Sequence, residues 1–328
     1  MTVASAPIAA EPWDTWQQGK PSLCPPDEVG PQHATPHRAR PRESITDRRR
    51  PQTQPRVSGE LRAADLTVAY DQRTILDGFD VTIPANSFTV IVGPNACGKS
   101  TLLRSLARLL PAAGGSVLLD STDIRTLKAK ELAKRIGLLP QSSIAPDTIT
   151  VADLVSRGRH PHQGILQRWS HDDDEAVEEA LVRTGLTDLA DRSVDELSGG
   201  QRQRVWIAMV LAQDTPVVLL DEPTTYLDLA HQIDVLELCA ELHRQGKTLI
   251  AVLHDLNQAA RYATHLIALK AGELIAEGPP ADVVTEELVA DVFGVRARIV
   301  PDPETGTPLV VPLAHSAIVQ RSPTTTPA

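Results

Sequence analysis

The fold class of this chain is decided by nine residues, Gly93-Pro94-Asn95-Ala96-Cys97-Gly98-Lys99-Ser100-Thr101. They lie between an apolar run at residues 88–92, which has the length of a buried strand, and a helical pattern at residues 102–106. A glycine-rich loop in this setting surrounds phosphate groups with backbone N–H donors, and the positive end of the helix dipole favours the same anion. The sequence therefore predicts a phosphate-binding loop in an α/β domain.

Two side chains of this loop have roles that follow from their chemistry. Lys99 is expected to reach the β- and γ-phosphates of a nucleotide, and Ser100 is expected to offer its hydroxyl to Mg²⁺. Mg²⁺ prefers oxygen ligands and commonly shares them with substrate phosphates. The alternative is an ordinary glycine turn before a helix, which the motifs further along the chain disfavour.

The composition indicates an acidic globular protein. The chain has 328 residues, of which 41% are hydrophobic, enough for one large domain or two of ordinary size. Its formal net charge is −10 and its pI is about 5.5. Outside the N-terminal tail no basic stripe could neutralise a phosphate backbone, so we expect no nucleic-acid partner.

Cysteine content and hydropathy restrict where the protein works. The three cysteines, Cys24, Cys97 and Cys239, are an odd number in a long chain, so a reducing cytosol fits better than a disulfide framework. No apolar run approaches the roughly 20 residues that cross a bilayer. Residues 1–7 have neither the basic region nor the apolar stretch of a secretory signal. If the protein serves transport, we expect it to be a peripheral subunit.

The chain divides by composition into one folded domain and two tails. Residues 1–58 are rich in proline, poor in large aliphatic residues and contain Arg48-Arg49-Arg50. We predict that they form a disordered tail; the alternative is an arginine-rich contact with anionic lipid or a partner. Residues 59–300 are expected to form the folded domain, residues 301–314 the strand of a C-terminal β-hairpin, and residues 315–328 a second disordered tail.

The folded part alternates strand and helix patterns, which predicts a mainly parallel sheet with covered faces. Alternating apolar residues at 61–70 and 75–83 predict an antiparallel hairpin before the phosphate loop. Residues 142–197 lack strand character, so we predict a helical subdomain there. Strands are expected at residues 88–92, 116–119, 136–140, 217–220, 248–253 and 265–269.

Two further motifs carry polar residues at the ends of predicted elements. A second glycine-rich turn, Leu197-Ser198-Gly199-Gly200-Gln201, opens a long helical stretch. Asp221 and Glu222 follow the strand at 217–220, at the carboxyl end where parallel sheets bind ligands. We expect Asp221 to hold Mg²⁺ through water and Glu222 to polarise a water for in-line attack on the γ-phosphate.

Together and in this order, the motifs resemble those of the nucleotide-binding subunit of ABC transporters, from about residue 60 to residue 300. The resemblance implies an α/β P-loop NTPase fold with a mainly parallel core sheet, an antiparallel β subdomain and a helical signature subdomain. It also implies an ATPase that binds ATP through residues 93–101 and uses Mg²⁺. Each motif alone is weakly specific, whereas the ordered set is very specific.

The resemblance assigns roles to residues outside the phosphate loop. Tyr70 stands where an aromatic ring stacks on adenine, Gln141 is the Q-loop glutamine and a ligand of Mg²⁺, and His254 is the switch histidine that senses the γ-phosphate. Tyr226-Leu227-Asp228 corresponds to the D-loop. With Glu222, the residues Gln141 and His254 form the expected catalytic set.

The resemblance further implies that one chain is an incomplete enzyme. In a head-to-tail dimer, residues 197–201 of one copy would close over the ATP held by residues 93–101 of the other. The other implied partners are membrane permease subunits, on whose cytoplasmic face the chain would lie, and indirectly an extracytoplasmic substrate-binding protein.

The expected cargo rests on two finer similarities. Residues 224–228, Thr-Thr-Tyr-Leu-Asp, and residues 156–162, Ser-Arg-Gly-Arg-His-Pro-His, resemble importers of iron–siderophore complexes. Haem and cobalamin importers are close alternatives, and a soluble ABC ATPase that never docks on a permease is another. Chromosome-maintenance ATPases are excluded because they need a long coiled coil between the phosphate loop and the signature.

Several residues have simpler interpretations as well. His160 and His162 could bind a metal but flank a proline in a segment that faces the permease in relatives. The acidic run at 172–175 is typical of a helix N-terminus without any ion. Cys97 could be a redox-sensitive thiol of lowered pKa or could simply pack. Ala96 replaces a glycine that many relatives have, so we expect a backbone conformation that alanine can adopt.

Overall fold

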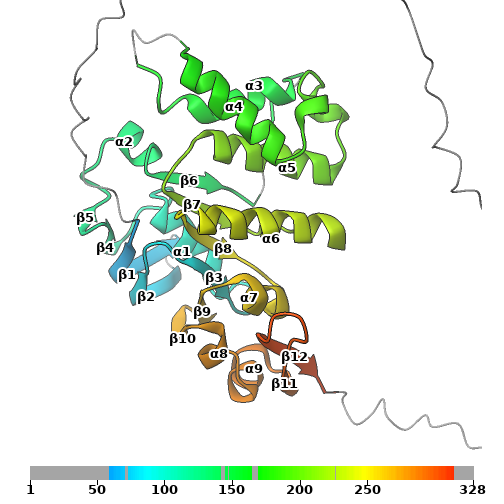
Figure 1. The fold of residues 1–328 in the computed structure, drawn as a ribbon. Helices are drawn as coiled ribbons and strands as arrows, with labels where there is room; N and C mark the ends of the chain where they lie inside the picture. Colours follow the sequence, from blue (N-terminus) through cyan, green and yellow to red (C-terminus); the bar gives the residue numbers. More distant parts are fainter. Residues whose placement is uncertain are drawn as a thin grey trace, which may run out of the picture. The chain divides into compact units, whose positions relative to one another are not determined.

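The computed structural model describes residues 59–70, 73–141, 145–146, 148–164, 169–225 and 227–313 (Figure 1). Every described residue belongs to one compact unit within residues 54–328. The two predicted tails, residues 1–58 and 315–328, lie outside the described residues.

A six-stranded sheet forms the centre of the described unit, in the order β10-β9-β3-β8-β7-β6. Strands β9, β3, β8, β7 and β6 are parallel, as predicted, whereas β10 pairs antiparallel with β9 and was not predicted. The strands span Phe88–Val92 (β3), Ile136–Leu139 (β6), Val217–Asp221 (β7), Thr248–Val252 (β8), His265–Lys270 (β9) and Glu273–Gly278 (β10).

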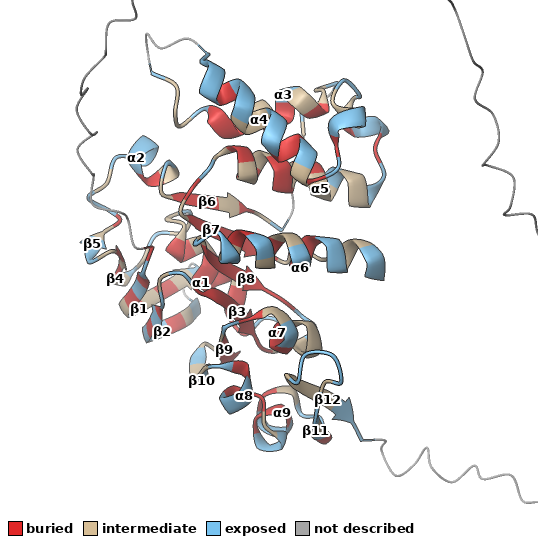
Figure 2. Cartoon of the chain, in the orientation of Figure 1, coloured by how far each residue is buried: buried red, intermediate tan, exposed pale blue. Residues whose placement is uncertain are grey.

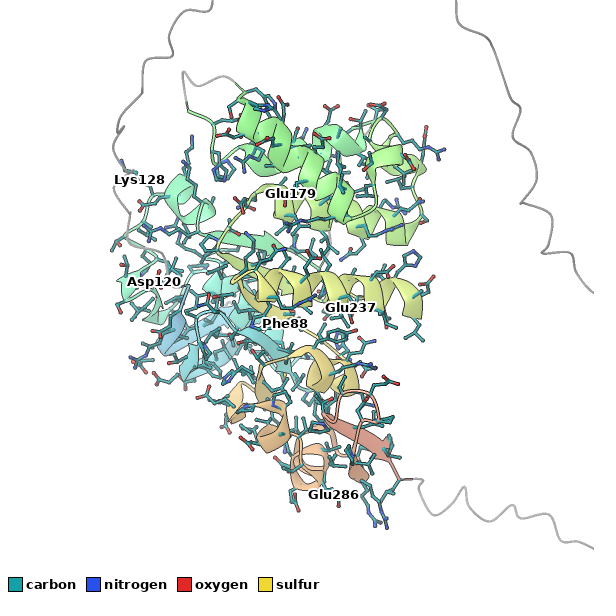
Figure 3. All side chains as sticks on the ribbon, viewed as in Figure 1. Phe88, Asp120, Lys128, Glu179, Glu237 and Glu286 are labelled. Carbon is teal, nitrogen blue, oxygen red and sulfur yellow. The ribbon has the colours of Figure 1, made fainter. Side chains whose placement is uncertain are left out.

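The central strands are buried on both faces, and this is why they are continuous apolar runs (Figure 2). Successive residues serve two different cores: Val90 and Val92 pack into one cluster, while Ile91 packs into the other. Phe88, near the centre of Figure 3, is fully buried and begins β3 in the first of these clusters. The sheet therefore separates two hydrophobic cores, each closed by helices or by the second sheet.

The second sheet is antiparallel, with the strand order β2-β1-β4-β5. The strands span Leu61–Tyr70 (β1), Arg73–Ile83 (β2), Gly114–Leu119 (β4) and Thr122–Asp123 (β5). The predicted hairpin before the phosphate loop is therefore confirmed, since β1 and β2 pair antiparallel. Two helices accompany this part of the chain, α1 (Lys99–Leu106) and α2 (Ala129–Ala133).

Helices α3 (Val151–Ser156), α4 (His171–Arg183) and α5 (Gly199–Ala212) form a separate helical group, at the top of Figure 1. Helices α3 and α4 lie within residues 142–197, where the helical subdomain was predicted. The group has its own apolar core, to which α5 contributes Val205, Ala208 and Ala212. The helical subdomain therefore extends past the boundary expected at residue 197. Short 3₁₀ turns connect it: Arg157–Arg159 (η1), Thr187–Leu189 (η2) and Val194–Glu196 (η3).

Helix α6 (Leu229–Arg244) packs on the central strands β3 and β8. Helices α7 (Leu256–Tyr262), α8 (Pro280–Val283) and α9 (Glu286–Phe293) pack against β3, β9 and β10. The C-terminal hairpin pairs β11 (Ala297–Pro301) with β12 (Pro308–Pro312). Its first strand begins at Ala297, so the domain boundary expected at residue 300 cuts through the hairpin. Asn257 of α7 exchanges two hydrogen bonds with the backbone of Val310, which attaches the hairpin to α7.

Among the described residues, no helix combines the length and the apolar character required to cross a bilayer.

Candidate active site

The strand order brings the predicted site residues together at one edge of the large sheet. Strands β3, β8, β7 and β6 are neighbours in that order, and their carboxyl ends lead to Gly93, His254, Asp221 and Gln141. Parallel strands end at the same edge, so four segments far apart in sequence meet there. A cavity of about 250 Å³ opens at this edge. Its lining consists of Arg73, Ile75, Asn95, Ala96, Gly98, Lys99, Ser100, Thr101, Glu222 and His254.

Glycine is required at both ends of the phosphate loop. Gly93 has φ 151°, and a Cβ there would lie 2.2 Å from the carbonyl oxygen of Leu269. Gly98 has φ 108° and is the N-cap of α1, which begins at Lys99 as predicted. Both backbone conformations are ones that residues with a side chain rarely adopt. The loop thus folds tightly between β3 and α1, and its N–H groups lie at the helix N-terminus, where an anion is favoured.

The side chain of Lys99 links the two ends of the phosphate loop. Its Nζ donates hydrogen bonds of 2.8 Å to the carbonyl oxygens of Gly93 and of Pro94, and the residue is only 5% exposed. An ammonium group has three N–H donors, so one remains for a phosphate oxygen while these two bonds hold the side chain in place.

Ala96 has φ 60°, in the small left-handed region. Alanine can adopt this conformation, as expected, but at a cost of roughly 1–2 kcal/mol that glycine does not bear. With alanine in place of glycine at position 96, the loop can therefore keep this backbone conformation, but at a higher conformational energy.

Ser100 and Asp221 lie together, as predicted for a pair of magnesium ligands. Ser100 Oγ donates a hydrogen bond of 2.7 Å to Oδ1 of Asp221, and Arg104 Nη2 lies 3.4 Å from Oδ2. Burial of Asp221 raises the pKa of its carboxyl group, although Ser100 and Arg104 oppose the rise; the neighbouring carboxylate of Glu222 adds to it. A carboxylate and a hydroxyl together supply the oxygen ligands that a divalent cation prefers. The positive charge of the cation would in turn stabilise the buried carboxylate.

Glu222 is the most heavily hydrogen-bonded side chain of the site. Its Oε1 lies 2.8 Å from Nε2 of His254, and its Oε2 accepts bonds of 2.8 Å from Gln141 Nε2 and 3.1 Å from Thr225 Oγ1. Burial alone would raise the pKa of this carboxyl group, but the bonds from His254, Thr225 and Gln141 outweigh burial and lower it. Glu222 is therefore held as a carboxylate, the protonation state of a general base.

The signature residues begin a helix, as predicted. Ser198 is the N-cap of α5: its Oγ accepts from the backbone N–H of Gln201, whose side-chain oxygen accepts in turn from the backbone N–H of Ser198. Leu197 is buried beneath this turn, while Ser198 and Gly199 are exposed. None of residues 197–201 lines the cavity at the phosphate loop of the same chain.

The residues predicted for the D-loop and for adenine stacking lie at the start of α6 and at the end of β1. Asp228 is the N-cap of α6, where its Oδ1 accepts from the backbone N–H of His231, and Tyr226 lies outside the described residues. Tyr70 is 43% exposed, which excludes a place in the core. It pairs across the β1–β2 hairpin with Arg73, which lines the cavity.

Sequence reasoning missed Arg73, Ile75, Arg104 and Thr225. Arg73 and Ile75 line the cavity from β2, and Arg104 reaches Asp221 from α1. No local motif marks these three positions. Thr225 could have been found, because it follows Glu222 by three residues and lies on the same loop.

The redox interpretation of Cys97 is not supported. Burial raises the pKa of its thiol, and the nearby Lys99 only reduces that rise. The residue is 4% exposed and belongs to a core cluster with Leu102. A buried thiol of raised pKa is a poor nucleophile, so Cys97 acts as a packing residue.

The histidines of residues 156–162 and the acidic run at 172–175 have structural explanations. His162 Nε2 lies 2.8 Å from the backbone oxygen of Gln213, which explains it without a metal, and His160 is exposed. Within the described ranges no group of three or more His, Cys, Asp or Glu residues is arranged to hold a metal ion. The acidic run begins α4, where Asp173 completes a capping box with Ser170.

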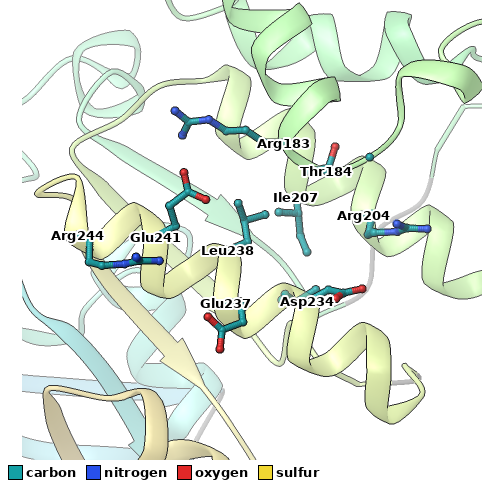
Figure 4. A pocket seen from close by; sticks show the side chains of 11 residues that line it. Arg183, Thr184, Arg204, Ile207, Asp234, Glu237, Leu238, Glu241 and Arg244 are labelled. Atoms are coloured by element: carbon teal, nitrogen blue, oxygen red, sulfur yellow. The ribbon is translucent and has the colours of Figure 1, made fainter.

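A larger cavity of about 470 Å³ lies between α6 and the helices α4 and α5 (Figure 4). Arginines and carboxylates line it, among them Arg183, Arg204 and Glu241. It contains none of the predicted site residues. The smaller cavity is therefore the candidate active site, because it combines the phosphate loop, Glu222 and His254.

Comparison with known sequences agrees with this geometry. The profile of a family described as "ABC transporter" matches residues 76–225. The ferric enterobactin transport ATP-binding protein of Escherichia coli (strain K12) is 57% identical over 258 residues, covering 78% of this chain and 95% of that protein. A protein of Bacillus subtilis (strain 168) named "Probable siderophore transport system ATP-binding protein" is 53% identical over 248 residues, covering 75% of this chain and 90% of that protein.

Among solved structures, an inward-facing metal-chelate type ABC transporter superposes with a TM-score of 0.67 at 28% identity. The match covers 78% of this chain and 98% of that one. The share of this chain that is matched, 78%, is close to the share that lies between residues 59 and 313, the first and last described residues.

Proposed function

Because the chain belongs to the ABC transporter family as an ATP-binding, ATP-hydrolysing subunit, we propose that it powers the import of ferric siderophores. The single observation that carries the ATPase assignment is the carboxylate of Glu222, held by His254, Gln141 and Thr225 beside the phosphate loop. The cargo assignment is supported by the names of the relatives with 57% and 53% identity, which are siderophore transport proteins.

In the proposed reaction, one group of site residues binds the phosphates and another activates the attacking water. The loop N–H groups and Lys99 bind the β- and γ-phosphates, and the N-terminus of α1 adds its dipole. Glu222 accepts the proton of the attacking water through a carboxylate oxygen, and His254 fixes the orientation of that carboxylate. Catalysis in phosphoryl transfer is mostly positioning and electrostatic stabilisation, which this arrangement of donors and one base supplies.

The donor set fits a magnesium ion. Ser100 Oγ, the Asp221 carboxylate and the Gln141 side-chain oxygen would hold it, either directly or through water. When bound, Mg²⁺ neutralises charge on the β- and γ-phosphate oxygens. Burial raises the pKa of Asp221, so a cation nearby would stabilise its ionised form.

A second copy of the chain would complete the site. Ser198, Gly199 and Gly200 begin α5 with exposed or half-buried backbone but do not line the cavity of their own chain. Helix N-termini bind anions. In the proposed head-to-tail dimer, this turn would close over the γ-phosphate held by the other copy, and Asp228 would lie at the interface.

The proposed assembly has the chain on the cytoplasmic face of the membrane, bound to permease subunits. The relatives named above are ATP-binding proteins of transport systems. A substrate-binding protein outside the membrane would deliver the ferric chelate to the permease, without touching this chain.

Uptake of labelled ferric siderophore tests the proposal in a strain that lacks the gene. Complementation with the wild-type chain is expected to restore uptake, whereas Glu222→Gln is expected to give a chain that binds ATP but restores less than about 1% of uptake, since it lacks the base. Thr82→Val, at an exposed position of β2 that does not line the cavity, is the control. Glu222→Gln with wild-type ATP turnover would contradict the ATPase assignment. Unchanged uptake in the deletion strain would contradict the cargo alone.

A further inference from the structure

The two oxygens of the Glu222 carboxylate are held unequally by the described residues. Oε1 has one partner among them, Nε2 of His254 at 2.8 Å. Oε2 has two, Nε2 of Gln141 at 2.8 Å and Oγ1 of Thr225 at 3.1 Å. His254 and Gln141 belong to the expected catalytic set, whereas Thr225 has no assigned role.

The two partners of Oε2 are attached to the protein in different ways. Gln141 is 81 residues from Glu222 in sequence and exposed, at the end of β6. If its amide turns to a magnesium ion, as the proposed function requires, its bond to Oε2 is lost. Thr225 is three residues from Glu222, and its backbone N–H donates to the carbonyl oxygen of Glu222. Its hydroxyl therefore keeps its place when Gln141 leaves.

The loop that carries Thr225 is itself anchored from two sides. Gln203 of α5 donates a hydrogen bond of 3.2 Å to the carbonyl oxygen of Pro223. Gln232 of α6 donates bonds of 3.4 Å and 3.0 Å to the carbonyl oxygens of Thr224 and Leu227. The backbone around Thr225 is thus fixed relative to both helices.

Glu222 needs such support because of its own backbone. Its φ is 56°, in the left-handed region that residues with a side chain adopt at a cost. This conformation sets the direction in which the side chain leaves the strand, but the side-chain torsions beyond Cβ have several allowed values. Contacts at the carboxylate then fix which oxygen faces the phosphate loop.

We propose that Thr225 is a positioning residue for ATP hydrolysis: its hydroxyl holds Oε2 of Glu222, so that the carboxylate keeps its orientation after Gln141 turns away. The inference rests on the proposed function, because it assumes that Glu222 is the base. Thr225 contacts Glu222 and acts through it.

Steady-state ATP turnover of the full-length chain tests this role with three variants. Thr225→Val replaces the hydroxyl with a methyl group of nearly the same shape, and it is expected to lower kcat about tenfold with KM for ATP within about twofold of wild type. Thr225→Ser keeps the hydroxyl and is expected to restore kcat to within about threefold. Thr82→Val makes the same chemical change at an exposed strand position and is expected to leave both constants unchanged.

A double-mutant cycle with Glu222→Gln separates positioning from a general structural effect. Thr225→Val is expected to have no further effect on the residual rate of Glu222→Gln, because the carboxylate that it positions is gone. A kcat of Thr225→Val within about twofold of wild type would overturn the inference, as would a loss that Thr225→Ser does not restore or one that persists in the Glu222→Gln background. Glu222→Gln with full turnover would instead overturn the proposed function.

Discussion

The buried ion pair between Arg159 and Asp173 predicts a large loss of stability when a single carboxylate becomes an amide. Arg159 Nε donates to Oδ1 of Asp173 at 2.8 Å, and the two side chains are only 9% and 6% exposed. Arg159 Nη1 also donates to the carbonyl oxygen of Ala212 at 2.9 Å. The guanidinium therefore joins η1, α4 and the end of α5, the elements of the helical group.

The substitution Asp173→Asn keeps the size of the side chain but leaves the charge of Arg159 buried without its counterion. Removing one partner of a buried pair typically costs about 3–5 kcal/mol. A loss of about 1 kcal/mol lowers the melting temperature of a domain of this size by roughly 2–4 °C. We therefore expect Asp173→Asn to lower the melting temperature by about 6–20 °C, measured by circular dichroism at about pH 7.

Two comparisons test the reasoning. Asp172→Asn changes an exposed carboxylate in the same first turn of α4, and it is expected to alter the free energy of unfolding by no more than about 0.5 kcal/mol. Replacement of both partners by Arg159→Met and Asp173→Leu is expected to cost less than Asp173→Asn alone, because no buried charge remains. A melting temperature of Asp173→Asn equal to that of Asp172→Asn would refute the argument.

The pH dependence has a defined sign. Burial would raise the pKa of Asp173, but the bonds from Arg159 and Ser170 outweigh burial and lower it below the unfolded value of about 3.9. A depressed folded-state pKa stabilises the protein above the unfolded pKa, and the contribution is lost as pH falls through the folded value. The difference in unfolding free energy between wild type and Asp173→Asn should thus be constant from about pH 7 to about pH 5 and shrink below about pH 4.

Two further predictions concern the active site. His254→Ala removes the hydrogen-bond donor that lies 2.8 Å from Oε1 of Glu222. ATP turnover of the assembled transporter is therefore expected to fall about 10- to 100-fold with little change in KM. Unchanged turnover would exclude a role of His254 in hydrolysis. Ala96→Gly removes the strain at φ 60° and is expected to raise the free energy of unfolding by about 0.5–1 kcal/mol in urea titrations. A decrease in stability would mean that the left-handed conformation of Ala96 costs less than the chain entropy of glycine.

The local signals in the sequence were sufficient for most of the fold. Apolar runs such as residues 217–220 predicted strands because a strand buried on both faces must be apolar throughout. The acidic run at residues 172–175 predicted the start of α4, since carboxylates favour the positive end of a helix dipole. Strand β10 was not predicted because it lies at the sheet edge, and its apolar run, Leu274-Ile275-Ala276, is only three residues long between Glu273 and Glu277.

The order of the motifs was sufficient to identify the family and to predict the chemistry of the site. A glycine-rich loop before Lys99 and a strand that ends in Asp221 and Glu222 indicate nucleotide chemistry, because the geometry that they require is local. The sequence thus predicted a phosphate loop, a pair of metal ligands and a base.

Only the tertiary structure decided which groups touch. Glu222 has Gln141 and His254 as partners because β6, β7 and β8 lie side by side, an arrangement that no local pattern encodes. The burial of Cys97, which raises the pKa of its thiol, depends on a core assembled from distant segments. The sequence determines the chemical type of each side chain and its local backbone geometry. Contacts between segments that are distant in sequence determine its neighbours and its exposure to water, and therefore its pKa.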